Sequence, residues 1–204
     1  MKQNIFLIGF MGSGKSHWGH IWALKNGYTF YDLDAQIEKA FKMPVQEIFE
    51  KHGEDKFREL ERYHLRKFLN KKKCLIACGG GTPCFFDNLE WMKKHGDVIY
   101  LQATTEYILN RVMDETAKRP LLKEVNTSEL LFFIEKKLKE REPVYLKADH
   151  ILDVNKLSES SLKFLFEETI SKIKSKKNEV EKEVEIPEEQ DTSKKYKTRT
   201  VHHA

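Results

Sequence analysis

Eight residues near the start of the chain have the types and spacing of a phosphate-binding loop. Gly9 to Ser16 reads Gly-Phe-Met-Gly-Ser-Gly-Lys-Ser and fills every fixed position of the pattern G-x-x-x-x-G-K-[ST]. Glycines let backbone N–H groups approach phosphate oxygens closely, and a helix N-terminus adds a positive dipole. In this pattern Lys15 reaches the β- and γ-phosphates and the Ser16 hydroxyl binds Mg²⁺. The stretch therefore predicts binding of ATP or GTP.

Two aspartates follow the second predicted strand, which runs from Tyr28 to Tyr31. Ligands of open parallel sheets bind beyond the carboxyl ends of the strands, so Asp32 and Asp34 are expected to face the phosphate loop. Asp34 could instead cap a helix that begins at Ala35, because aspartate is a preferred N-cap residue. The position after a strand favours a functional role for the pair.

A glycine triplet at 79–81 follows another predicted strand, Cys74 to Cys78. Three glycines at the carboxyl end of a buried strand permit close approach of a ligand to the backbone. Upstream, Phe57, Arg58 and Glu61 cluster on a predicted helix over 54–69. Spacing alone favours a structural role for that cluster, since Glu54 and Arg58 stand four residues apart and can form a solvated ion pair.

These candidates need a scaffold, and the chain alternates short apolar strands with helical segments. The strands are expected at 4–8, 28–31, 74–78, 97–101 and 150–154. This alternation predicts a three-layer α/β/α P-loop fold with a five-stranded parallel sheet. The polar segment 114–126 contains Arg119 and is either a mobile lid or an ordinary exposed loop. A helix over 128–141 ends at Arg141.

Composition narrows the class of protein. The chain has 36 basic and 32 acidic residues, a net charge of +4 in 204 residues, which argues against a one-signed surface for nucleic acid. Its three cysteines include no C-x-x-C pair, so we expect a reduced, cytoplasmic chain. No signal peptide and no apolar run long enough to span a bilayer is recognised. Residues 1–174 are expected to form one domain, and 175–204 a charged, disordered tail.

Six motifs taken together resemble the shikimate kinase family over about residues 3 to 174. No single motif is specific, but their order and spacing are. The motifs are GFMGSGKS (9–16), YDLDAQIE (31–38), GEDKFRELE (53–61), GGG (79–81), KRPLL (118–122) and REPVY (141–145).

The resemblance implies a role for each motif. ATP would be the co-substrate, with Mg²⁺ held by Ser16 and, through water, by Asp32. The implied catalytic residues are Lys15, Asp34 as the base that contacts the shikimate hydroxyls, and the lid arginine Arg119. Residues implied for the nucleotide are Gly12, Ser13, Gly14, Lys15, Ser16, His17, Arg111 and Arg119. Residues implied for shikimate are Asp34, Phe57, Arg58, Glu61, Gly79, Gly80, Gly81 and Arg141, with the two arginines on its carboxylate.

The chain departs from the family pattern at three places. His17 stands where threonine is common, Thr82-Pro83-Cys84 follows the glycine triplet, and the spacing from Arg111 to Arg119 is altered by a residue. None removes a group that phosphoryl transfer requires. We expect a monomer that phosphorylates shikimate at its 3-hydroxyl, in chorismate and aromatic amino acid biosynthesis. The alternatives are another small-molecule kinase, for gluconate or a nucleoside monophosphate, and a non-catalytic sensor.

Overall fold

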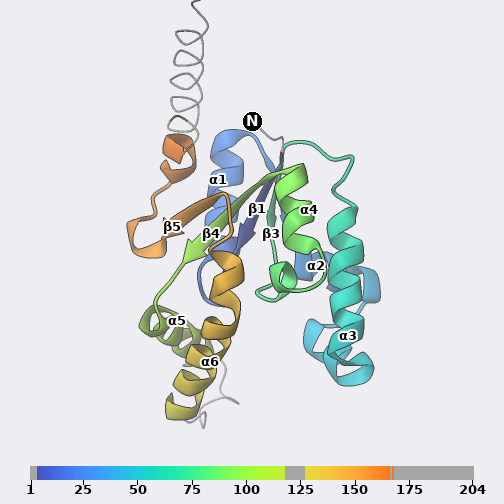
Figure 1. Cartoon of the computed structure of the whole chain (residues 1–204), viewed down its shortest axis with the longest axis vertical. Helices are drawn as coiled ribbons and strands as arrows, with labels where there is room; N and C mark the ends of the chain where they lie inside the picture. Colours follow the sequence, from blue (N-terminus) through green and yellow to red (C-terminus); the bar gives the residue numbers. More distant parts are fainter. Residues whose placement is uncertain (1–3, 118–126, 166, 168–204) are drawn as a thin grey trace, which may run out of the picture. The chain divides into compact units, whose positions relative to one another are not determined.

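The structure is a computed structural model that describes residues 4–117, 127–165 and 167 (Figure 1). Residues 1–162 belong to one compact unit and 163–204 to another, and the elements below lie in the first. Its strands are β1 (Ile5–Ile8), β2 (Thr29–Asp32), β3 (Cys74–Ala77), β4 (Asp97–Gln102) and β5 (His150–Asp153). Its α-helices are α1 (Lys15–Asn26), α2 (Leu33–Phe41), α3 (Val45–Arg66), α4 (Asn88–His95), α5 (Thr105–Ala117) and α6 (Thr127–Tyr145). Short 3₁₀ helices are η1 (Thr82–Cys84) and η3 (Val154–Lys156).

The five strands form one sheet in the order β2-β3-β1-β4-β5, and every pairing between neighbours is parallel. The central strands β1 and β3 are buried along their whole length, as the apolar sequences IFLI and CLIA require. The predicted α/β/α fold with a five-stranded parallel sheet is confirmed.

Helices α1 and α4 cover opposite faces of the sheet. A Cβ on Gly19 of α1 would lie 3.2 Å from the Leu75 side chain, so this helix packs closely on one face. Trp91 of α4 makes an edge contact with Phe6, whose register partner is the residue after Leu75, on the other face. The two layers leave the carboxyl ends of the strands facing α2 and α3 to one side and α5 and α6 to the other (Figure 1).

Several helix boundaries differ from the sequence prediction. The helix predicted to end at Arg141 continues as α6 to Tyr145. The helix predicted to begin at 54 instead begins at Val45, as α3, and crosses a kink where Gly53 has a φ of 77°. That helix ends at Arg66, three residues before its predicted end. Helix α5 continues to Ala117, which makes 114–117 helical and leaves 118–126 of the expected lid, with Arg119, outside the described residues. The tail at 175–204 is outside them too.

Across the residues that the structure describes, we find no helix that is both long and apolar enough to cross a membrane.

Candidate active site

The loop from Gly9 to Ser16 turns β1 into α1 at the carboxyl edge of the sheet. Gly12 and Gly14 have φ values of 75° and 87°, which only glycine adopts without strain. Gly14 is the N-cap of α1, so the first N–H groups of the helix open toward the loop. The geometry is that of an anion-binding helix N-terminus reached through a glycine-rich turn.

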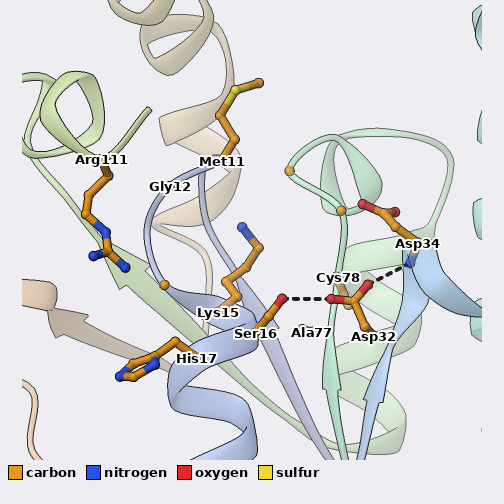
Figure 2. A pocket seen from close by; sticks show the side chains of 13 residues that line it. Met11, Gly12, Lys15, Ser16, His17, Asp32, Asp34, Ala77, Cys78 and Arg111 are labelled. Atoms are coloured by element: carbon orange, nitrogen blue, oxygen red, sulfur yellow. Dashed lines mark hydrogen bonds between the residues drawn. The ribbon is translucent and has the colours of Figure 1, made fainter. Parts of the chain in front are cut away.

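A cavity of about 280 Å³ opens beside this loop (Figure 2). In Figure 2 the Lys15 side chain enters it between Arg111 and His17 on one side and Asp32 and Asp34 on the other. Of the residues implied for the nucleotide, Ser13 is buried behind the lining and Arg119 is outside the described residues. The lining residues are Met11, Gly12, Gly14, Lys15, Ser16, His17, Asp32, Asp34, Ala77, Cys78, Gly79, Gly80 and Arg111.

The Lys15 amine is held in place by its own loop. Its Nζ donates to the carbonyl oxygens of Gly9 at 2.9 Å and Phe10 at 2.8 Å. Burial lowers the pKa of Lys15 to about 8, and the nearby carboxylate of Asp34 opposes that shift. A phosphate arriving in the cavity would favour the charged form and draw the amine away from the two carbonyls.

Asp32 links the loop to the second strand. Its Oδ2 accepts a hydrogen bond of 2.7 Å from the Ser16 hydroxyl (Figure 2), and its Oδ1 accepts from the backbone N–H groups of Asp34 and Ala35. Asp32 is therefore the N-cap of α2. The alternative in which Asp34 caps this helix is wrong, because the helix begins at Leu33 and its first turn already contains Asp34.

Because Asp32 is the N-cap of α2, the Asp34 side chain is not used for capping, and it lines the cavity. Its Oδ1 is buried and accepts no hydrogen bond from any residue that the structure describes. Burial raises the pKa of Asp34 to about 6, the negative charges of Glu61 and Asp32 add to the rise, and Lys15 opposes it. A buried acceptor atom without a partner is costly unless a ligand supplies a donor, so this oxygen is suited to receive a hydroxyl.

The glycine triplet is the point where the remaining candidates meet. A Cβ on Gly79 would lie 2.6 Å from Glu61 Oε1 and 2.9 Å from Asp34 Oδ1. Only a glycine leaves room for both carboxylates at this position. The absent side chain is thus what allows Asp34, on α2, to approach Glu61, on α3.

The next two glycines of the triplet each lie against an arginine side chain. A Cβ on Gly80 would lie 3.2 Å from Arg141 Nη1, and one on Gly81 would lie 2.5 Å from Arg58 Nη1. Arg58 from α3 and Arg141 from α6 therefore lie against consecutive residues of one loop. They do not line the 280 Å³ cavity, which reaches the triplet at Gly79 and Gly80.

Arg58 is buried, and this corrects the expectation of a solvated ion pair. Its Nη2 does contact Glu54 at 2.7 Å, but its Nη1 also contacts Glu61, which is fully buried, at 2.5 Å. Its guanidinium lies over the ring of Phe85, 4.4 Å from the ring centre, and near the rings of Phe49 and Phe57. Phe57 is thus part of the wall around the arginine.

Sequence reasoning missed two buried residues of this group. The Tyr145 hydroxyl donates to the carbonyl of Gly80 at 2.5 Å, and the Thr82 hydroxyl donates to Glu61 Oε1 at 2.5 Å. Tyr145 closes the motif REPVY, so its place in that motif was the available indication. Thr82 had none beyond its position after the triplet, because its partner is 21 residues away.

Cys78 lines the cavity, but its thiol is not activated as a nucleophile. The thiol is buried, and burial raises its pKa well above the ordinary value, with Glu61 and Asp34 adding to the rise. The reactive thiolate form is therefore disfavoured.

With this geometry in place, comparison with known proteins identifies the family. A sequence model described as "Shikimate kinase" matches residues 11–178. The chain is also similar to a shikimate kinase of Phocaeicola vulgatus, with 41% identity over 155 residues, 76% of this chain and 89% of that protein. The chain belongs to the shikimate kinase family. A family member from Parabacteroides distasonis is 39% identical over 76% of this chain and 90% of its own length.

Solved structures agree. A shikimate kinase from Bacteroides thetaiotaomicron has a TM-score of 0.75 and 37% identity, covering 82% of this chain and 98% of that one. A shikimate kinase from Acinetobacter baumannii, in complex with shikimate, has a TM-score of 0.71 and 32% identity, covering 84% and 95%. A gluconokinase from Sinorhizobium meliloti, with a TM-score of 0.52 and 16% identity over 78% and 86%, shares only the fold.

Proposed function

We propose that this member of the shikimate kinase family transfers the γ-phosphoryl group of ATP to the 3-hydroxyl of shikimate, giving ADP and 3-phosphoshikimate. The observation that carries the proposal is the glycine triplet, which gathers Asp34, Arg58, Glu61 and Arg141 beside the phosphate loop. A carboxylate-bearing acceptor matches two guanidinium groups, and a hydroxyl matches the unpartnered oxygen of Asp34. The product would serve chorismate and aromatic amino acid biosynthesis.

At the phosphate end, backbone N–H groups of Gly12, Ser13 and Gly14 would hold the phosphates, and Lys15 would neutralise the transferring group. Arg119 is proposed as a further cation there on family resemblance alone. His17 and Arg111 both line the cavity and are proposed to contact the nucleotide beyond the phosphates.

Mg²⁺ fits the residues at one corner of the cavity. The Ser16 hydroxyl and the Asp32 carboxylate are hard oxygen donors that already contact each other and both line the cavity. Mg²⁺ keeps several waters and binds through one or two protein oxygens plus phosphate, so a larger protein cage is not required. When bound, the ion would supply positive charge that offsets the negative charge of the transferring phosphoryl group.

At the acceptor end, Arg58 and Arg141 would hold the shikimate carboxylate and thereby aim its 3-hydroxyl at the γ-phosphate. As the new O–P bond forms and the bond from Pγ to the bridging oxygen of ADP breaks, the hydroxyl proton passes to Asp34. A base with a pKa of about 6 is ionised at neutral pH and able to accept that proton.

We also propose the extent of the catalytic domain, the oligomeric state and the compartment of this chain. The catalytic domain spans residues 1–174, and the charged segment 175–204 lies outside the chemistry. The chain acts as a monomer on small molecules. It works in the reducing cytoplasm, in keeping with its three free cysteines.

The test is ADP release with Mg-ATP against shikimate, quinate, gluconate and a nucleoside monophosphate. We expect turnover with shikimate, and with quinate only at a much lower kcat/KM. Turnover confined to gluconate or a nucleotide would overturn the substrate assignment. Shikimate binding without any ADP release would favour a non-catalytic sensor.

A further inference from the structure

The carboxylate of Glu61 accepts a hydrogen bond on each of its two oxygens. Its Oε2 accepts from Arg58 Nη1, and its Oε1 accepts from the hydroxyl of Thr82. All three side chains are buried. Because each oxygen has its own donor, the plane of the carboxylate is fixed, and Glu61 gives Arg58 one oxygen only.

The backbone of Thr82 is hydrogen-bonded on both sides of its side chain. Its backbone N–H donates to the carbonyl of Gly79 at 3.0 Å, and its own carbonyl accepts from the buried side chain of Asn88 at 2.9 Å. It begins the 3₁₀ helix η1, in which Pro83 follows it. The backbone that carries the hydroxyl is therefore held at both its N–H group and its carbonyl.

The donors of Arg58 can be counted. A guanidinium has five N–H groups. In the described part of the chain, Nε and Nη2 each donate one to Glu54 Oε1 and Nη1 donates one to Glu61 Oε2, which uses three. Five less three leaves two, one on each terminal nitrogen, and these are available as charged donors to a substrate carboxylate.

We propose that Thr82 is a positioning residue for the acceptor: by holding Oε1 of Glu61, it keeps the last two N–H groups of Arg58 available to the substrate carboxylate. The inference rests on the proposed function and deepens it. Without the hydroxyl, Oε1 of Glu61 is a buried acceptor with no partner. The nearest remedy is rotation of the carboxylate onto Arg58 in a two-oxygen contact, which uses a donor that the substrate needs.

The test replaces the hydroxyl without changing the shape of the side chain. Thr82→Val removes the donor, Thr82→Ser keeps it, and Thr29→Val on β2, exposed and away from the site, is the matched control. We expect Thr82→Val to raise the KM for shikimate by roughly 10- to 100-fold, the range of a lost hydrogen bond to a charged group. The KM for ATP should stay within about twofold, and Thr82→Ser and Thr29→Val should behave as the unaltered chain.

A second ligand separates positioning from general loss of structure. An analogue of shikimate with a hydroxymethyl group in place of the carboxylate lacks the negative charge and the second acceptor oxygen that Arg58 would bind. Thr82→Val should weaken binding of this analogue by less than about threefold while weakening shikimate by the full factor. Equal weakening of both ligands, or an unchanged shikimate KM, would overturn the inference.

Two outcomes are kept apart by the same assays. If the unaltered chain does not phosphorylate shikimate, the proposed function fails; if it does and Thr82→Val is normal, only the role of Thr82 fails. Should Thr82→Val not fold, Thr82→Cys gives a weak donor of similar size. That variant should raise the shikimate KM by roughly 3- to 10-fold with the same dependence on the substrate carboxylate, and a normal KM there counts against the inference.

Discussion

The phosphate end and the acceptor end of the site are built in opposite ways. The phosphate end is one continuous stretch, Gly9 to Ser16, whose main chain provides the donors and whose glycines provide the turn. The acceptor end takes Asp34 from α2, Arg58 and Glu61 from α3 and Arg141 from α6, and joins them on a triplet after β3. One is local backbone geometry; the other is an assembly of charged side chains over more than a hundred residues.

The difference has an energetic side. Backbone donors at a helix N-terminus carry no net charge, although Lys15 beside them is a cation whose pKa burial lowers. The acceptor end buries Arg58 and Glu61 and leaves one oxygen of Asp34 without a donor. Buried charges are tolerated only when paired, and here Arg58 and Glu61 compensate each other's charge in the empty protein. The acceptor end should therefore be the part where function and stability conflict.

The largest effect should come from removing the base. Asp34→Asn keeps the shape of the side chain but cannot accept the hydroxyl proton, and general-base catalysis is worth roughly 10²- to 10⁴-fold. We expect kcat to fall by that factor while the dissociation constant for ATP changes by less than about threefold. Steady-state kinetics and a direct binding measurement with the same preparation check both numbers. An unchanged kcat would remove Asp34 from the mechanism.

The next effect concerns stability and separates a buried ion pair from a surface one. Arg58→Ala leaves Glu61 buried without its cation, and breaking a buried pair by removing one partner costs about 3–5 kcal/mol. Arg62→Ala, one turn along the same helix, removes an arginine that is 49% exposed and 3.4 Å from Asp87, a loss of at most about 1 kcal/mol. Denaturant unfolding of both variants measures the difference. Equal free energies of unfolding would show that Glu61 is not held by Arg58.

The contrast between the two ends also decides what the sequence could predict. The phosphate loop, Lys15 and Ser16 follow from one motif, because all its parts are local and each glycine has a φ-dependent reason to be there. The five strands follow from short apolar runs, and no strand end shifts by more than one residue. Arg58 could not be read correctly from spacing, since Glu54 at i−4 predicts a surface pair and the burial comes from Phe85 and Gly81, far along the chain. Family resemblance, not local pattern, pointed to it.

A smaller effect tests the electrostatic strain at Asp34. Burial and neighbouring carboxylates raise its pKa from 3.8 to about 6, so the folded protein binds more protons than the unfolded chain between those values. Stability contributed by this group is therefore lost as pH rises from about 4 to about 6. Asp34→Asn should be more stable than the unaltered chain above pH 6.5, by an amount on the order of 1–3 kcal/mol that shrinks toward pH 4.

This difference is measured by thermal or denaturant unfolding without nucleotide and with EDTA, so that no ligand charge acts on the carboxylate. Asp55→Asn, on the exposed side of α3, serves as the control and should shift stability by less than about 0.5 kcal/mol. A stability difference between Asp34→Asn and the unaltered chain that stays constant from pH 4 to pH 8 would mean that Asp34 has an ordinary pKa.

The smallest effect uses one chemical change at both ends. Gly14→Ala places a Cβ at a φ of 87°, a strain of about 1–2 kcal/mol in the phosphate loop. Gly81→Ala meets no backbone strain, since its φ is −84°, but its Cβ would lie 2.5 Å from Arg58 Nη1 and displace the guanidinium. We expect roughly a tenfold rise in the KM for ATP from the first and in the KM for shikimate from the second.

The matched pair is informative because neither variant adds or removes a charge. If the two ends bind their substrates independently, Gly14→Ala should leave the KM for shikimate within about twofold, and Gly81→Ala should do the same for the KM for ATP. The triplet does touch the phosphate loop, since a Cβ on Gly80 would lie 3.5 Å from the carbonyl of Gly9, the same oxygen that accepts from Lys15. A rise in both KM values for either variant would therefore show that the two ends communicate through Gly80 and Gly9, and the two ends would then differ in how they are built without binding their substrates independently.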